Sequence, residues 1–303
     1  MDSTEFLNFF FDRIEGQLDP TSQKFLVQDF FTFKRVEQRQ CSGCKYVKNR
    51  IDRSYNLSVD VQHLSTLEAS LNKLITTSKI EDYKCDQCNQ KVNLMQQEMI
   101  LNTPQVLCIQ LKRFVFSFET LSNEKINTKL EFPTTLDLKQ YSLKGIAEQE
   151  GTTEQLMKDP ELAPYLQLDD AHYIYKLVGV NIHKGTATHG HYFSYINCAR
   201  GKDEHDPVTK ESEWLAAEKD TWREFNDEDV KYFSFKELSK EAFGSLESSI
   251  AAKDASSGQS AYMLVYERKH RSAIRQVQPD GTETTIALNE IEKYVPEWLQ
   301  NEV

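Results

Sequence analysis

Two C-x-x-C pairs stand far apart in this sequence, and they constrain the fold more than any other feature. Cys41-Ser-Gly-Cys44 and Cys85-Asp-Gln-Cys88 are separated by 40 residues, and each pair follows a segment that resembles a strand. Four thiolates at two such turns make the closed tetrahedral sulfur site that structural zinc prefers. A shared metal would tie together the tips of two long hairpins, so one structural zinc is expected here.

Two alternatives to zinc stay open: four reduced, merely buried cysteines, or a redox C-x-x-C. Six cysteines in 303 residues are too few for a disulfide scaffold. Cys108 lies in an apolar run and is predicted to be a small core residue. Cys198 follows a strand and has no helix start to lower its pKa, so neither residue is predicted to be a nucleophile.

Composition limits the class of protein. With 39% apolar residues, 13 Tyr and 17 Phe, the chain can bury a substantial core. The net charge of -11 would repel phosphate backbones, so nucleic acid is not an expected partner. The acidic start does not fit a secretory signal, and no stretch is apolar enough for a membrane helix. We therefore expect a cytoplasmic or nuclear protein with no membrane partner.

Apolar spacing predicts three helical segments. Asp2 can cap a helix that runs to Leu18. Ser65 and Glu68 form a capping box before leucines at helical spacing. The last stretch, residues 286–303, also has helical spacing.

Strands are expected where β-branched and aromatic residues gather or alternate with polar ones. These segments are 25–36, 55–61, 92–101, 106–114, 129–132, 173–182, 192–197 and 261–267. Between them the chain turns polar and acidic in three places, which predicts surface insertions. The predicted insertions are 144–168, 200–220 and 234–260.

A histidine at the start of a strand is the main sign of chemistry. His191 follows Gly190 after a polar loop, where its side chain can project into a cleft. Asn226 and Asp227 lie downstream and could orient an imidazole through its second nitrogen. Together these residues are part of a Cys-His-Asn type of site.

Other interpretations of the histidines remain at this stage. His191 could be an ordinary, partly buried histidine. A metal site made of His183, His189 and His191 is a third reading, although no acidic residue lies among them.

The order of motifs resembles that of the ubiquitin-specific proteases, and the resemblance covers residues 2 to about 268. Within that family it is nearest to the large multi-domain members. The opening Asp2-Ser-Thr-Glu-Phe-Leu is similar to the helix that follows the family's nucleophile helix. The other motifs are the two C-x-x-C pairs, Leu111-Lys-Arg-Phe114, Lys125-Ile-Asn127, Phe132-Pro133, Gly190-His191-Tyr192, Phe225-Asn226-Asp227 and Ala261-Tyr-Met-Leu-Val-Tyr-Glu267.

The resemblance implies an α+β, papain-like cysteine protease fold with a palm, zinc-ribbon fingers and an incomplete thumb. Residues 1–268 would form the catalytic domain without its amino-terminal part, followed by an extension that starts a helical region. Its expected parts are a residual thumb helix at 2–18, fingers at about 25–105, a palm at about 106–268 and the extension at 269–303.

The resemblance also assigns roles to individual residues. His191 would be the general base and Asn226 the orienting residue, with Asp227 as an assistant. Ubiquitin would sit on the fingers, and its tail would enter a channel beside the histidine. The residues expected to bind substrate in this channel are Gly190, Tyr192 and His189.

The family's nucleophile lies upstream of the segment that begins at Asp2, at a helix start that favours thiolate. The chain as given is therefore predicted to lack its nucleophilic cysteine and to be inactive, most simply as a truncated deubiquitinase, with an exposed apolar face on helix 2–18. The alternative is a non-catalytic pseudo-protease that binds ubiquitin. An unrelated zinc-ribbon protein that binds nucleic acid is disfavoured by the charge.

Overall fold

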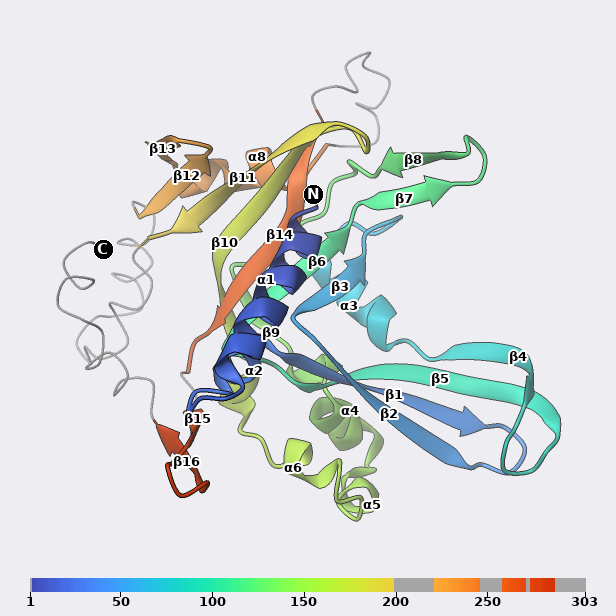
Figure 1. The fold of residues 1–303 in the computed structure, drawn as a ribbon. Helices are drawn as coiled ribbons and strands as arrows, with labels where there is room; N and C mark the ends of the chain where they lie inside the picture. The colour runs from blue at the N-terminus through green and yellow to red at the C-terminus, as the bar shows by residue number, and fades with distance from the viewer. Residues whose placement is uncertain (1, 199–220, 246–257, 271–272, 287–303) are drawn as a thin grey trace.

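The structure is a computed structural model that describes residues 2–198, 221–245, 258–270 and 273–286 of the 303-residue chain. Within these residues two antiparallel-rich sheets and several helices make a mixed α+β fold (Figure 1). No helix of the described part is long and apolar enough to cross a membrane.

The larger sheet has eight strands, and its central strands are buried on both faces. Apolar side chains from β10 and β14, among them Val180, Ile182 and Leu264, are almost fully buried and form the main core. All neighbouring pairs are antiparallel except β3 and β6. The strand order is β13 (Asp229–Tyr232), β12 (Trp222–Asn226), β11 (Gly190–Asn197), β10 (Ile174–Gly185), β14 (Gln259–Arg268), β6 (Val106–Lys112) and β3 (Asn56–Asp60), with β9 (Thr135–Asp137) beside β10.

The smaller sheet has four strands and reaches away from the larger one (Figure 1). Its strand order is β2 (Val47–Ser54), β1 (Phe33–Cys41), β5 (Lys91–Asn102) and β4 (Ser78–Lys84). The two hairpins, β1–β2 and β4–β5, end in the turns that carry the C-x-x-C pairs. Since β1 pairs with β5, the two turns lie at the same end of the sheet.

Helix α1 (Ser3–Leu18) begins at Asp2, whose carboxylate accepts hydrogen bonds from the backbone N–H groups of Thr4 and Glu5. One side of α1 packs on the large sheet, and Phe11 is buried. The opposite side carries exposed Phe6, Phe9 and Phe10. The predicted exposed apolar face on residues 2–18 is therefore present.

The segment 144–168 was expected to be a surface insertion, and that prediction is wrong. It folds as α4 (Leu143–Glu150), α5 (Thr153–Leu156) and α6 (Ala163–Leu166). Their buried leucines, isoleucine and alanine close a second core against β1 and β5 at the base of the small sheet. Each buried Leu or Ile contributes about 1.5–3 kcal/mol to stability, so this segment is structural in spite of its acidic composition.

The strand predicted at 25–36 is correct only from Phe33 onward. Residues 26–31 form α2 (Leu26–Phe31), and the strand begins only at Phe33. The rings of Phe31 and Phe11 stack at 4.3 Å, so packing against α1 overrides the strand preference of the aromatic residues. The strand predicted at 129–132 is reduced to an isolated bridge between Glu131 and Thr66.

Several other boundaries also differ from expectation. Helix α3 (Leu67–Ile75) is capped by Thr66, whose hydroxyl accepts from the Ala69 N–H, and not by Ser65. The extension begins as a hairpin, β15 (Ile274–Val277) and β16 (Glu283–Ile286), and not as a helix. The insertion predicted at 200–220, and residues 287–303 of the helix expected at 286–303, lie outside the described residues. Part of 234–260 is the short helix α8 (Leu238–Ala242).

Candidate active site

The four paired cysteines converge at the tip of the small sheet. The sulfur atoms of Cys41, Cys44, Cys85 and Cys88 all lie within 4.8 Å of one another, and no other group of this kind occurs among the described residues. The Sγ atoms of Cys41 and Cys88 are 4.0 Å apart, and those of Cys44 and Cys85 are 3.8 Å apart. Around a tetrahedral zinc with Zn–S of about 2.3 Å, sulfurs stand about 3.8 Å apart, so the set fits that ion.

The local backbone favours the thiolate form of Cys41. The Cys44 N–H donates to Sγ of Cys41 over 3.4 Å. This backbone hydrogen bond is the main cause that lowers the pKa of Cys41 to about 6. Although a backbone hydrogen bond to Tyr46 works the other way, burial and the neighbouring cysteines raise the pKa of Cys44 to about 11. The tetrahedral spacing of the four sulfurs, and not their acidity, therefore supports a metal over four neutral thiols.

His191 and Asn226 lie on neighbouring strands of the large sheet. His191 is near the start of β11, and Asn226 ends β12, which pairs with β11. Nε2 of His191 is 2.6 Å from Oδ1 of Asn226. Because an amide oxygen can only accept, we assign the ring proton to Nε2, which leaves Nδ1 free to act as a base.

Asp227 has a looser relation to the same ring. Its nearest carboxylate oxygen is 3.6 Å from Nε2 of His191, and its side chain is 77% exposed. It also occupies the left-handed region at φ 52°, at the turn between β12 and β13. A screened, exposed carboxylate adds little to the position of the imidazole compared with the direct Asn226 contact.

The turn between β10 and β11 depends on its two glycines. Gly185 has φ +130°, which an L side chain rarely adopts. A Cβ on Gly190 would lie 2.2 Å from Nε2 of His183. The His183 ring therefore occupies the space that a side chain at position 190 would need. Burial lowers the pKa of His183 to about 4, with Lys125 as the second cause.

Asp2 joins helix α1 to the strands beside His191, a contact that the sequence did not reveal. Its second carboxylate oxygen accepts from the hydroxyls of Tyr262, at 2.6 Å, and Tyr192, at 3.2 Å. Burial and the Asp2 hydrogen bond raise the pKa of Tyr262 to about 12. Because these partners are 190 and 260 residues from Asp2, only the folded chain shows the cluster.

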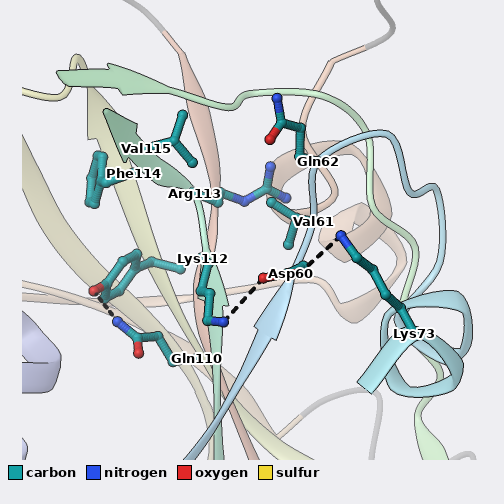
Figure 2. Close-up of a pocket in the computed structure, with 10 residues that line it drawn as sticks. Asp60, Val61, Gln62, Lys73, Gln110, Lys112, Arg113, Phe114 and Val115 are labelled. Atoms are coloured by element: carbon teal, nitrogen blue, oxygen red, sulfur yellow. Dashed lines mark hydrogen bonds and ion pairs between the residues drawn. The ribbon is translucent and has the colours of Figure 1, made fainter. Parts of the chain in front are cut away.

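A hollow of about 240 Å³ lies next to Tyr262, at the carboxyl ends of the paired strands β3 and β6 (Figure 2). Gln110 donates to the Tyr262 hydroxyl at one wall. Asp60 pairs with Lys112 and Lys73 at another wall. The hollow therefore adjoins the same tyrosine that Asp2 holds.

The remaining predicted site residues are spread out. His189 is exposed in the turn, where its Nδ1 is 3.0 Å from the Thr188 hydroxyl. His183, His189 and His191 do not form a group with metal-binding geometry among the described residues. Cys108 is buried, and burial raises its pKa to about 12. Cys198 follows the far end of β11, roughly 23 Å of strand from His191.

Comparisons with known proteins agree on one family. The family model described as Ubiquitin carboxyl-terminal hydrolase matches residues 1–266. Mouse Ubiquitin carboxyl-terminal hydrolase 9X is 30% identical over 253 residues, which cover 80% of this chain and 9% of that protein. Human Ubiquitin carboxyl-terminal hydrolase 34 is 28% identical over 280 residues, covering 88% of this chain and 7% of the relative.

A solved structure gives the same answer for the fold. The SAGA DUB module of Ubp8, Sgf11, Sus1 and Sgf73 bound to monoubiquitin matches with a TM-score of 0.60 and 25% identity. The match covers 92% of this chain and 49% of that one. The chain belongs to the ubiquitin-specific protease family of cysteine peptidases, as the motifs predicted. It spans less than a tenth of the length of the first curated relatives.

Proposed function

We propose that this chain carries the ubiquitin-binding palm and fingers of a deubiquitinase, together with the base and the orienting residue of its active site. The observation that carries the proposal is the 2.6 Å contact between His191 and Asn226 in a chain of this family. Residues 2–18 are the thumb helix, about 25–105 the fingers and about 106–268 the palm. Protein substrates and linkage preference are not part of the proposal.

In the proposed reaction a cysteine thiolate attacks the carbonyl of the terminal glycine of ubiquitin. Nδ1 of His191 takes the thiol proton and passes it to the leaving lysine amine. Water then hydrolyses the acyl-enzyme, with His191 again as base. Asn226 keeps the ring proton of His191 on Nε2 throughout, and the exposed carboxylate of Asp227 adds a weak attraction to the same ring.

We propose that none of the six cysteines of this chain is the nucleophile. Four of them form the sulfur cluster, Cys108 is buried with a raised pKa, and Cys198 is a strand length from His191. The attacking cysteine would come from an upstream part of a longer protein. The exposed phenylalanines of α1 offer an apolar surface for it to pack on.

The four clustered cysteines would hold a single structural zinc. With all four ligand positions taken by sulfur, the ion has no place for a reacting water and serves to join the two hairpins. Ubiquitin would rest on this sheet, with its tail leading to Gly190, Tyr192 and His189. We propose a cytoplasmic or nuclear location.

Two measurements test the proposal. Titrating isotope-labelled ubiquitin with this chain should shift ubiquitin resonances, and absence of any shift would rule out both the enzyme and the pseudo-protease readings. Ubiquitin with a carboxy-terminal electrophile should leave the chain unlabelled; labelling at Cys108 or Cys198 would contradict the nucleophile assignment.

The pseudo-protease alternative is separated from the enzyme by the transcript. An in-frame cysteine at a helix start upstream of the Met1 codon supports the enzyme. A stop codon there supports a protein that binds ubiquitin without cleaving it.

A further inference from the structure

Lys125 lies at the end of β8 (Ser122–Lys125), the second strand of a small hairpin with β7 (Phe114–Ser117). Its Nζ donates to the carbonyl oxygen of His183 over 2.8 Å and to that of Gly258 over 2.6 Å. These acceptors belong to the end of β10 and to the residue just before β14. One side chain therefore joins three segments that are far apart in the sequence.

The register places this junction directly at the histidine of the site. Lys184 of β10 pairs with His191 on one side and with Gln259 on the other. The two carbonyls that Lys125 binds come from the residues immediately before Lys184 and immediately before Gln259. The Gly258 carbonyl also accepts from the N–H of Gly185, over 3.0 Å, so the same oxygen holds the first residue of the turn.

The imidazole itself has little else to hold it. The His191 side chain is 47% exposed, and within the described part of the chain its polar partners are Asn226 and Asp227 on the β12–β13 turn. The position of the His191 imidazole relative to Asn226 therefore depends on the backbone at the start of β11. The start of β11 pairs with the end of β10, and Lys125 binds a carbonyl at that end of β10.

The surroundings of Lys125 fit a side chain that links two backbone carbonyls by hydrogen bonds and not one that forms an ion pair. Among the described residues no carboxylate pairs with it, and burial lowers its pKa to about 7, with repulsion from Arg113 as the second cause. His183 is the other titratable group that interacts with it. A neutral amine keeps two N–H donors and an ammonium has three, so both carbonyls are satisfied in either protonation state.

We propose that Lys125 is a positioning residue: by binding the carbonyls of His183 and Gly258 it fixes the base of the β10–β11 turn and keeps the His191 imidazole on Asn226. This proposal rests on the proposed function for the meaning of the His191–Asn226 pair. It does not rest on ubiquitin binding, and it is tested without ubiquitin.

The test is the tautomer of His191, read from long-range ¹H–¹⁵N spectra of the histidine side chains in their neutral form. The His191 signal is assigned by its loss in His191→Gln. In the parent chain the proton is expected on Nε2. In Lys125→Met, which keeps the side-chain length but cannot donate, the two ring nitrogens should shift toward each other as both tautomers become populated.

Lys125→Gln is the second variant, for the case in which Lys125→Met does not give a folded amide spectrum. Its shorter amide reaches at most one of the two carbonyls, so an intermediate shift is expected. Lys129→Met is the matched control, because Lys129 is partly exposed, pairs with Glu131 and lies on the same stretch of chain. It should leave the His191 signals unchanged.

Parent-like nitrogen shifts in the folded Lys125 variants would overturn the proposal, whatever happens to their melting temperature. An equal shift in Lys129→Met would also overturn it, since the effect would then not be local. Failure of ubiquitin to bind would contradict the proposed function and leave the tautomer result standing.

Discussion

At the scale of single residues, the site depends on what contacts the rings of His191 and His183. Oδ1 of Asn226 accepts a hydrogen bond from Nε2–H of His191, and Gly190 has no side chain where the ring of His183 lies. His191, Gly190 and Asn226 could be named as candidates from sequence because they stand in two short motifs, Gly190-His191-Tyr192 and Phe225-Asn226-Asp227. The reason for the glycine could not be predicted, since it depends on where the ring of His183 points.

Gly190→Ala should destabilise the chain by about 1–3 kcal/mol, because the added methyl group meets the His183 ring and the carbonyl of Lys184. Urea denaturation measures the change. Gly16→Ala is the control: nothing lies within 4 Å of its added Cβ in the last turn of α1, so it should be neutral or stabilise by up to about 1 kcal/mol. Equal effects of the two changes would contradict the packing argument.

At the scale of elements, strands with clear alternation and helices with regular apolar spacing were predicted well, although the cap of α3 was placed one residue early. Segments decided by tertiary packing were not predicted. Strand β3 and helix α3 follow their sequence patterns closely. Helix α2 does not, because the stack of Phe31 on Phe11 outweighs local preference. The helices at 143–166 were missed because their few apolar residues are diluted by acidic ones and only the folded chain shows the core they close.

Helix α1 should lose its attachment to the sheet when Asp2 is changed to Ala. The change removes the cap and leaves the hydroxyls of Tyr192 and Tyr262 without their acceptor, which together cost about 2–4 kcal/mol. Hydrogen exchange should show faster opening of α1 than of β10. Glu5→Ala is a fair comparison, because the Glu5 side chain is exposed and makes no such contact. Unchanged exchange in α1 would refute the attachment.

The two hairpins of the small sheet should depend on zinc. Metal analysis is expected to find about one zinc per chain, and Cys41→Ser or Cys88→Ser should lose it together with the order of the hairpin tips. Cys198→Ser should keep the metal, since Cys198 is not in the cluster. Zinc-free parent protein with ordered tips would show that the cluster is only a set of neighbouring thiols.

At the scale of the whole molecule, stability should fall as the pH drops from about 6.5 toward 4. Burial lowers the pKa of His172 to about 3 and that of His183 to about 4, both from 6.5. In this window the unfolded chain binds protons that the folded chain does not, so acid favours unfolding. His172→Gln should reduce the slope near pH 5 by about 1.4 kcal/mol per pH unit. An unchanged slope in His172→Gln would contradict the burial effect.

The overall architecture followed from the motif order, because the cysteine turns and the histidine motif identify the family. What the sequence did not predict are long-range polar contacts such as Asp2 with Tyr262 and Lys125 with Gly258. Any of several tyrosines or carbonyls could have been the partner until the sheet register was known.

The hairpin β15–β16 bears on where an expression clone should stop. Arg275 donates to the carboxylate of Asp29 on α2 through its backbone N–H, at 2.8 Å, and through its guanidinium, at 2.6 and 3.0 Å. Ile274 beside it is buried. The family match ends at residue 266, before this hairpin. Protein that ends at residue 266 would leave the largely shielded carboxylate of Asp29 without its counter-ion. Recombinant protein that ends after residue 286 should therefore be more stable.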